Sequence, residues 1–266
     1  MIFAAGLGTR LKPLTDTMPK ALVPLAGKTL LQWQVEKLRD AGITDIIVNV
    51  HHFPDQIIAT IRRNNAWGCN IMISDERDEL LDTGGGLKKA LTTNPLIHSS
   101  TNPILACNVD ILSNIDLRAL IKEYERAGVS QLVVSERDTQ RYLCFDEEDL
   151  LCGWTNIKTG EQKGTDGKHL AFSGMQILSP EVLACLAQIP QNKFSLIDFY
   201  VSLCEKKHTP YTVHHTPLKA YVPKDYQMMD VGKIEQINDA EHFATMLFDI
   251  KSKKNDKKFG HIKKKS

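Results

Sequence analysis

Several hallmarks of membrane, secreted and zinc-binding proteins are missing from this sequence of 266 residues. No apolar run reaches the roughly 18 residues that a membrane-spanning helix needs, and no secretory signal is recognisable. The six cysteines contain no CxxC pair, and no histidine cluster accompanies them, which argues against a structural zinc site. We therefore expect reduced thiols in a cytoplasmic protein that contacts no membrane.

A large excess of one charge is missing as well, since the formal net charge is +1. The near-zero net charge nevertheless includes a strongly basic segment at the C-terminal end of the sequence. Residues 251–266 contain eight lysines and one aspartate, so this tail carries about +7 and the remaining residues about −6. Phe259 is the one Phe, Tyr or Trp of the tail, whereas segments that bind nucleic acid interleave aromatics with their cations. The pattern predicts a solvated, disordered extension and no nucleic-acid partner.

Short apolar runs alternate with amphipathic segments in the first half of the chain. The pattern predicts strands at 1–5, 45–50, 70–73, 104–108 and 131–135, and helices at 30–41, from Pro54, from about Gly85 and from Leu117 to Gly128. Repeated β-α-β units of this kind bury a parallel sheet between helices. We therefore expect an α/β fold, a Rossmann-like three-layer α/β/α arrangement around a mainly parallel, mixed and twisted sheet.

The second half is less regular. It predicts a hairpin within 143–154, a polar segment at 158–168, a strand at 170–178, helices opened by Ser179 and Ser195, short strands at 211–215 and 218–222, and a final helix at about 233–248. No internal repeat and no clean linker precede residue 250, so we expect a single domain over 1–250.

A glycine-rich loop follows the first strand, in the string AAGLGTRLKPLTDTMPK of residues 4–20. Gly6 and Gly8 allow the backbone to approach a ligand closely, and amides at the end of a parallel strand suit phosphate oxygens. Arg10 and Lys20 add two cations for phosphate. The loop is not a dinucleotide fingerprint, because Leu11 stands where a third glycine is needed, and GK[ST] is absent.

The longer string, GLGTRL followed by PLT, PK, LVPL and GK, resembles the signature of the sugar-nucleotidylyltransferase superfamily. The resemblance implies the nucleotide-diphospho-sugar transferase type of fold. It also implies that the loop holds a nucleoside triphosphate, and it assigns catalytic roles to Arg10 and Lys20. The nucleotide-binding residues implied by the resemblance are Ala5, Gly6, Gly8, Thr9 and Arg10. Thr29 replaces the family's proline at a helix start.

Two aspartates are candidates for a metal site. Asp110 follows the buried strand at 104–108, where a side chain reaches the ligand crevice, and Asp230 lies just before the final helix. Converging carboxylates hold Mg²⁺ beside phosphates, although each aspartate could instead cap a helix or turn. The resemblance assigns both as catalytic metal ligands and makes Mg²⁺ the cofactor. It departs at Val109, where the family has glycine, and at Lys233, where it has threonine.

The resemblance also implies sites for the base and the sugar. The family has a nucleobase loop where DTGGG stands at 82–86, which assigns Gly84 and Gly85 to the nucleotide. Asn108 is expected to contact the ribose or the sugar, and the sugar is assigned to Ser173 and Gly174 as well. The family's EKP motif is missing. The stretch 160–164 offers Glu161 and Lys163, and Lys163 stays outside the catalytic set.

The implied reaction joins a nucleoside triphosphate to a sugar 1-phosphate and releases pyrophosphate, as in sugar-nucleotide and cell-envelope polysaccharide synthesis. The TGGG form favours UTP with an N-acetylmuramate or hexose 1-phosphate. Other nucleotides stay open: GTP with mannose or heptose 1-phosphate, dTTP with glucose 1-phosphate, and CTP with phosphocholine. A nucleotide-binding regulatory subunit is the alternative from outside the enzymes. The nucleotide-binding half is expected at 1–135 and the sugar-binding half at 136–250.

Overall fold

The computed structural model describes residues 1–94, 102–204 and 216–247. The strand predicted at 211–215 and the Lys-rich tail at 251–266 lie outside the described residues. Within the described part, no helix combines the length and apolar character that crossing a bilayer requires. All six cysteines lie in the described part, and none of them forms a disulfide there.

The strands alternate with helices over the first half and cluster in the second. The strands are β1 (Ile2–Phe3), β2 (Pro24–Leu25), β3 (Lys28–Thr29), β4 (Asp45–Val50), β5 (Asn70–Asp75), β6 (Ile104–Asn108), β7 (Ile111–Ser113), β8 (Ser130–Ser135), β9 (Arg141–Phe145), β10 (Leu151–Asn156), β11 (Glu161–Gly164), β12 (Lys168–Leu178), β13 (Leu218–Tyr221) and β14 (Met228–Asp230). The helices are α1 (Leu30–Asp40), α2 (Pro54–Arg63), α3 (Asp82–Thr93), α4 (Leu117–Ala127), α5 (Pro180–Ala187) and α6 (Leu196–Cys204). Residues 237–247 are also helical.

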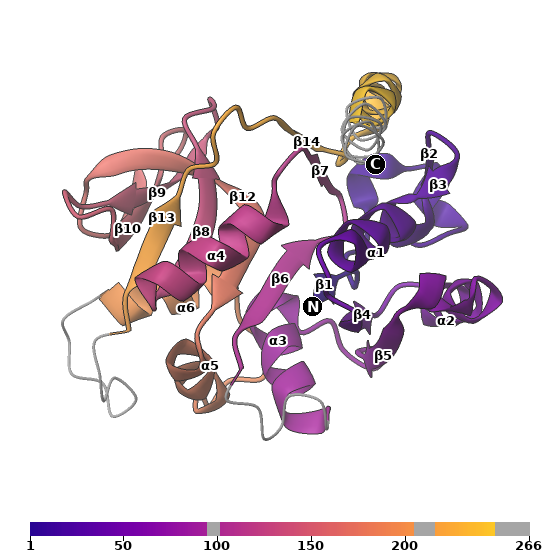
Figure 1. The fold of residues 1–266 in the computed structure, drawn as a ribbon, viewed down its shortest axis with the longest axis horizontal. Coiled ribbons are helices and arrows are strands. Elements are labelled where there is room, and N and C mark those ends of the chain that lie inside the picture. Colours follow the sequence, from indigo (N-terminus) through magenta and orange to yellow (C-terminus); the bar gives the residue numbers. More distant parts are fainter. Residues whose placement is uncertain (95–101, 205–215, 248–266) are drawn as a thin grey trace, which may run out of the picture.

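One mixed sheet runs through the molecule in the order β11-β10-β9-β12-β6-β1-β4-β5, with β8 also paired to β12 and β13 paired to β8 (Figure 1). Strands β6, β1, β4 and β5 are parallel, and β12 joins them antiparallel beside β6. The predicted hairpin appears as β9 and β10, which pair antiparallel. The carboxyl ends of β1, β4 and β6 therefore meet at one edge of the sheet, where α/β folds bind ligands.

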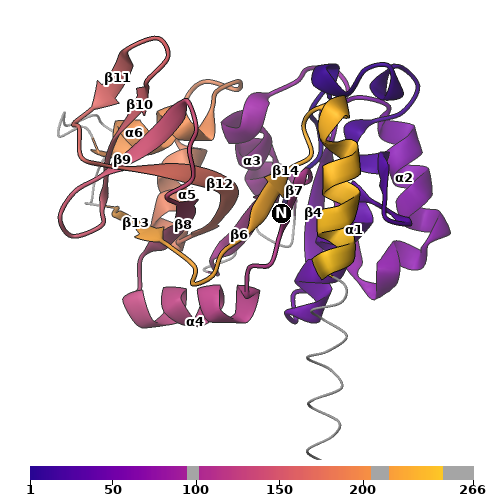
Figure 2. The same cartoon turned by 90° about the horizontal axis from the view of Figure 1, so that it is seen from above.

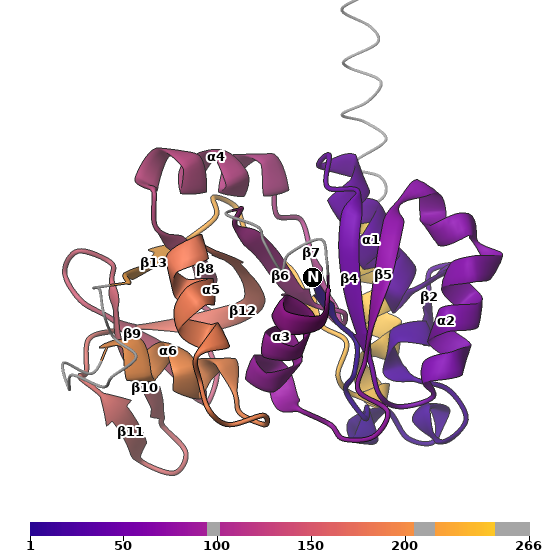
Figure 3. The same ribbon diagram turned by 90° about the horizontal axis from the view of Figure 1, so that it is seen from below.

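Two apolar clusters cover the two faces of this sheet. Side chains on α1, α2 and α4 pack with Ile2 and Val48 on one face, while α3, α5 and α6 pack with Phe3 and Ile47 on the other. Successive strand residues point to opposite faces, which explains the alternation between the clusters. Figures 2 and 3 show α3 on one side of β4 and α1 with α2 on the other. The predicted three-layer α/β/α architecture is confirmed.

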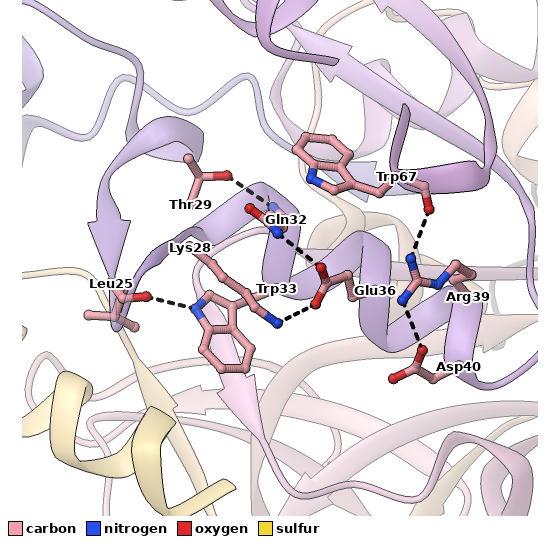
Figure 4. Close-up of polar contacts among 9 residues, drawn as sticks. All are labelled: Leu25, Lys28, Thr29, Gln32, Trp33, Glu36, Arg39, Asp40 and Trp67. Atoms are coloured by element: carbon pink, nitrogen blue, oxygen red, sulfur yellow. Dashed lines mark hydrogen bonds and ion pairs between the residues drawn. The ribbon is translucent and has the colours of Figure 1, made fainter. Parts of the chain in front are cut away.

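Helix α1 shows how the sequence fixes a helix start and end (Figure 4). The Thr29 hydroxyl accepts a hydrogen bond from the Gln32 amide at 3.1 Å, so Thr29 caps the helix where the family has proline. The Trp33 indole donates to the carbonyl of Leu25 at 3.0 Å and ties α1 to the β2–β3 hairpin. At the other end, Arg39 donates to the carbonyl of Trp67 at 2.9 Å.

Several predicted boundaries were wrong. The first strand covers two residues, Ile2–Phe3, because the chain turns into the glycine-rich loop earlier than expected. Helix α3 begins at Asp82, so the three glycines form its first turns instead of a loop before it. The polar segment at 158–168, for which no strand was predicted, contains the strand β11. The final helix starts with a 3-10 turn at Ile234–Gln236.

A short two-stranded sheet that the hydrophobic pattern did not predict connects distant parts of the chain. Strand β14 pairs antiparallel with β7, and Asp230 lies opposite Ile111. The amide of Val231 donates to the carbonyl of Asp110 at 2.9 Å. This pairing places Asp230 next to Asp110, although the two residues are 120 positions apart in the sequence.

Candidate active site

A cleft of about 410 Å³ opens at the carboxyl ends of β1 and β6. It is lined by Phe3, Ala4, Gly6, Leu7, Gly8, Thr9, Arg10, Lys20, Leu80, Thr83, Asn108, Val109, Asp110 and Gly232. Seven residues predicted from the sequence meet here: Gly6, Gly8, Thr9, Arg10, Lys20, Asn108 and Asp110. Of the other predicted residues, Ala5 is buried beneath the loop, and Asp230 lies beside the cleft next to Arg10.

Gly8 fixes the shape of the loop after β1. Its φ of 65° lies in the left-handed region that favours glycine. A Cβ at this position would lie 2.8 Å from Cγ2 of Thr15 and 3.0 Å from Cβ of Lys20. The carbonyl of Gly8 accepts hydrogen bonds from the Thr15 hydroxyl at 2.9 Å and from the Leu11 amide at 2.8 Å. The loop thus needs glycine both for its backbone angle and for contact with Lys20.

Lys20 and Asp110 form a nearly buried ion pair at the floor of the cleft. Lys20 begins the 3-10 turn Lys20–Leu22 and is 8% exposed. Its ammonium group donates to Oδ2 of Asp110, which comes from the turn after β6. Removing one member of such a pair leaves the other charge desolvated, which is strongly unfavourable. The pair therefore fixes the position of the Lys20 ammonium group in the cleft.

Asp230 and Arg10 form a more open pair beside the first. The guanidinium group of Arg10 lies 4.0 Å from the Asp230 carboxylate, and both side chains are about half exposed. Gly232 permits this approach, because a Cβ there would lie 2.8 Å from Nη2 of Arg10. Partial burial and the charge of Asp110 raise the pKa of Asp230, while Lys20 and Arg10 act in the opposite direction. The carboxyl group is therefore short of compensating positive charge.

The two carboxylates fit a hard divalent cation. Asp110 and Asp230 come from neighbouring strand ends, and their mutual repulsion contributes to the raised pKa of Asp230. An ion with oxygen preference, such as Mg²⁺, would relieve that repulsion.

The glycines at the start of α3 are buried against the chain itself. A Cβ on Gly84 would lie 2.4 Å from the ring of Phe194, and one on Gly85 would lie 2.0 Å from the carbonyl oxygen of Asn192. Both glycine amides donate to the carbonyl of Phe194. The expectation that residues 82–86 form a loop ahead of the helix was therefore wrong. Their lack of side chains permits close packing, and Leu80 with Thr83 lines the cleft instead.

Asn108, Ser173 and Gly174 come together across strands β6 and β12. Gly174 has a φ of 66°, and a Cβ there would lie 2.7 Å from Nδ2 of Asn108. Asn108 is partly exposed and lines the cleft. Ser173 is fully buried. Gly174 therefore supports the position of Asn108, and the cleft surface in this part comes from Asn108.

The sequence model of the Nucleotidyl transferase family matches residues 1–247 of this chain. The chain belongs to the nucleotidyl transferase family. It is therefore an enzyme of the nucleotidyltransferase class, and the resemblance drawn from residues 4–28 is confirmed. The match includes both aspartates and extends to the last described helix.

Three similar proteins illustrate the range within this family. N-acetylmuramate alpha-1-phosphate uridylyltransferase of Caulobacter vibrioides is 33% identical over 211 residues, which cover 76% of this chain and 83% of that protein. The protein of the same name from Neisseria meningitidis is 42% identical over 119 residues, or 45% of this chain and 49% of that protein. The crystal structure of HddC from Yersinia pseudotuberculosis complexed with GMP-PN has a TM-score of 0.68 at 26% identity and covers 91% of this chain and 96% of its own.

This nucleotidyl transferase also contains a buried polar network that the sequence reasoning missed. Oδ1 of Asn49 accepts from the Ala4 amide at 2.7 Å, and its Nδ2 donates to Glu76 at 2.7 Å. The other oxygen of Glu76 accepts from the Leu81 amide at 3.3 Å. Glu76 is 1% exposed, and burial raises its pKa. The network joins the start of the glycine-rich loop after β1 to the start of α3.

A signal for this network was present in the sequence. Asn49 is a polar residue inside the apolar run DIIVNV, and Glu76 directly follows the next strand, β5. Both positions lie at the carboxyl ends of neighbouring parallel strands. Polar groups buried at that edge are candidates for supporting a ligand site.

Proposed function

We propose that this enzyme transfers a uridylyl group from UTP to the phosphate of an N-acetylmuramate or related hexose 1-phosphate and releases pyrophosphate. The two relatives described as uridylyltransferases support the nucleotide and the sugar class. The observation that carries the proposal is the meeting of the Gly8 loop, the Lys20–Asp110 pair and the Arg10–Asp230 pair in one cleft. The nucleotide substrate is consistent with a cytoplasmic enzyme.

The cleft can perform the transfer without a general base, because the attacking sugar phosphate oxygen is already anionic. That oxygen attacks the α-phosphorus of the triphosphate in line with the departing pyrophosphate. In this mechanism Gly8, Thr9 and Arg10 bind the β- and γ-phosphates through amides and a guanidinium group. Lys20 places its positive charge near the α-phosphate, where charge density changes during transfer. Catalysis then rests on positioning and electrostatics.

Mg²⁺ would be held by Asp110 and Asp230, and when bound it would reduce the repulsion between the two anionic substrates. The remaining roles belong to the chain itself. Asp110 also orients Lys20 through their ion pair. Arg10 is held over the cleft edge by Asp230 and by the space that Gly232 leaves. Lys233, which departs from the family pattern, directly follows Gly232 and would either alter the contacts there or add a cation near the phosphates.

For the other substrates, we assign the base to the region near Gly84, Gly85 and their cleft-lining neighbour Thr83. Asn108 lies between the phosphate loop and β12, a position suited to the ribose or the sugar. Ser173 and Gly174 would act on the sugar through Asn108, since Ser173 itself is buried. The nucleotide half at 1–135 and the sugar half at 136–250 follow from this assignment.

The test is a panel of UTP, GTP, dTTP and CTP against N-acetylmuramate, glucose, mannose and heptose 1-phosphates, read by pyrophosphate release in Mg²⁺. We expect UTP with N-acetylmuramate 1-phosphate to give the highest kcat/KM. The likeness to HddC complexed with GMP-PN favours guanylyl transfer as the second candidate. A preference for GTP with a heptose or mannose phosphate would reject the uridylyl assignment. Nucleotide binding without turnover on any pair would point to a regulatory subunit.

Variants of two aspartates on adjacent loops separate site chemistry from general charge loss. Asp110→Asn should reduce turnover about 100-fold or more, since one carboxylate of the cation site and the partner of Lys20 are lost together. Asp16→Asn is the matched control, because Asp16 is exposed and pairs with Lys12 alone among the described contacts. Equal activity in the two variants would remove Asp110 from the reaction centre.

A further inference from the structure

A second group of metal-binding side chains lies outside the cleft. Sγ of Cys144, a carboxylate oxygen of Asp166 and a ring nitrogen of His169 all lie within 4.8 Å of one another. Asp166 Oδ1 is 2.7 Å from Nε2 of His169 and accepts from the Cys144 thiol at 3.7 Å. Cys144 is buried, whereas Asp166 and His169 are exposed. Thiolate, imidazole and carboxylate are the three ligand types that proteins use for zinc.

The sheet itself creates this arrangement. Strand β12 runs antiparallel to β9 with His169 directly opposite Cys144, so the two side chains project from the same face. Asp166 comes from the turn between β11 and β12. The ring of Tyr142, two residues before Cys144 on β9, stacks on His169 with centroids 5.6 Å apart. The imidazole therefore has a neighbour on the strand that restrains its orientation.

Three glycines let the turn that carries Asp166 lie close to the β9–β10 hairpin. A Cβ on Gly167 would lie 2.3 Å from the carbonyl oxygen of Phe145, and one on Gly153 would lie 2.2 Å from that of Thr165. A Cβ on Gly164 would lie 2.5 Å from the carbonyl oxygen of Cys152. Any side chain at these positions would push the turn away from Cys144. The close approach of Asp166 to Cys144 is thus built into the sequence.

We propose that Cys144, Asp166 and His169 bind one Zn²⁺ ion, at a site separate from the aspartates of the cleft. Zn²⁺ bonds to sulfur at about 2.3 Å and to nitrogen or oxygen at about 2.0 to 2.2 Å, which places tetrahedral ligand atoms about 3.3 to 3.7 Å apart. Asp166 and His169 have to separate by less than about 1 Å to reach that geometry. The exposed side of the cluster leaves the fourth position to water.

Binding exchanges a proton for the ion. The S–H bond of Cys144 breaks, the sulfur–zinc bond forms and the proton passes to solvent, so the charge on the cluster rises by one. The negative charge of Asp166 lies beside Cys144 and His169 and attracts a divalent cation to them. A sequence rule based on CxxC spacing could not find this site, because its ligands come from one strand, one turn and a second strand.

The ion would cross-link parts of the chain in the half of the molecule that carries the β9–β10 hairpin. It would connect β9, β12 and the turn at 165–167, which are joined at this place by main-chain pairing and the Asp166 contacts. Zn²⁺ should therefore raise the unfolding temperature of the full chain. This effect does not depend on which sugar phosphate the enzyme uses.

The test uses Co²⁺ as a spectroscopic probe on the full chain, after treatment with a chelator and in excess Mg²⁺ to occupy carboxylate sites. We expect a thiolate-to-cobalt charge-transfer band that saturates at one ion per chain and disappears on addition of Zn²⁺, which binds more tightly. Cys144→Ser should abolish the band. His169→Ala and Asp166→Asn should weaken Co²⁺ binding at least about tenfold.

Controls address folding and other thiols. Cys185→Ser removes a partly buried cysteine on α5 and should keep the band unchanged. His169 and Asp166 are exposed, so their variants decide the question if Cys144→Ser folds poorly by circular dichroism. A missing band in the wild-type chain would overturn the proposal. A band that survives Cys144→Ser or His169→Ala would overturn it equally, because the ion would then lie on other residues.

Discussion

The cleft and the β9–β12 region each gather charged side chains, but they do so by different means. In the cleft, loops that start at the carboxyl ends of the parallel strands β1 and β6 carry Arg10, Lys20 and Asp110. In the β9–β12 region, Cys144 and His169 face each other across antiparallel strands. The loops place groups for ligands that arrive from solvent, whereas the strands fix groups against one another.

The charged side chains of the two regions also differ in how deeply they are buried. Lys20 is 8% exposed and neutralised by Asp110, so its charge acts in surroundings that screen it weakly. Lys163 on β11 has a side chain that is 39% exposed, and its partners Asp198 and Glu161 face solvent. A charge of equal size should therefore influence chemistry far more in the cleft than on β11. The following predictions test that difference.

The largest effect is expected for Arg10→Ala. Loss of the guanidinium group should lower turnover about 100- to 1,000-fold, as for other groups that stabilise developing charge. The free energy of unfolding should stay nearly unchanged, because the Arg10 side chain is 59% exposed and lies 4.0 Å from Asp230. Pyrophosphate release and urea unfolding measure the two quantities. Lys12→Ala is the control, since Lys12 lies on the same loop with a 61% exposed side chain. Similar losses in both variants would assign the effect to net charge.

A second, structural effect is expected at Gly8. An alanine there adopts the left-handed region at a cost of about 1 to 2 kcal/mol, and its Cβ meets Thr15 and Lys20, which adds about 1 to 3 kcal/mol. Gly27→Ala is the matched control, because Gly27 also has a positive φ, 78°, but nothing lies within 4 Å of its Cβ. Urea unfolding should show the larger loss for Gly8→Ala. Pyrophosphate release should fall in that variant alone, since Lys20 shifts. Equal losses of stability in Gly8→Ala and Gly27→Ala would mean that Thr15 and Lys20 move away from the added methyl group at little cost in free energy.

The contrast between the regions also explains what could be predicted from the sequence. Gly6, Gly8, Thr9, Arg10 and Lys20 lie within one contiguous stretch, so the motif identified them together and the cleft brings them together. The parallel strands followed from apolar runs with helices between them. Asp230 was assigned by resemblance, and its actual position beside Asp110 depends on the β7–β14 pairing, which strands of only three residues do not reveal.

Features that depend on strand register or on close packing could not be predicted from the sequence pattern. The glycines 84–86 suggested an open loop, because the sequence does not show that Phe194 and Asn192 cover them. Cys144 and His169 are 25 positions apart, and their proximity follows from the β9–β12 register alone. Asn49 and Glu76 were passed over because a buried hydrogen bond between two strand ends has no fixed spacing.

A pH-dependent effect of intermediate size is expected at Glu76, which, together with Asn49, connects the glycine-rich loop after β1 to α3. Its pKa is raised above the ordinary 4.5 by burial. The folded protein therefore holds the proton more tightly than the unfolded chain does. The free energy of unfolding should fall as pH rises from about 4.5 through the raised pKa, and then level off. Glu76→Gln should lack this part of the fall.

Urea unfolding of both proteins between pH 4 and pH 8 measures the Glu76 contribution. Other groups, Asp230 included, titrate alike in the two proteins, so the difference between the two curves isolates Glu76. We expect that difference to change within the acidic window and to stay constant above it. Two parallel curves over the whole range would show that the carboxyl group ionises as readily in the folded protein as in the unfolded chain.

The smallest effect is expected for Lys163→Ala, which tests the comparison from the β9–β12 side. The Lys163 ammonium donates to Asp198 at 2.7 Å and lies 5.3 Å from the centre of the Trp154 ring, at a solvent-exposed place. Exposed pairs contribute little, so kcat should stay within about fivefold of the wild-type value. Steady-state pyrophosphate release with saturating substrates measures kcat separately from substrate binding. A loss as large as that of Arg10→Ala would show that β11 supplies a cation to the reacting phosphates. The proposed difference between the two regions would then fail, because Arg10 on a cleft loop and Lys163 on a strand would both act on the same transfer.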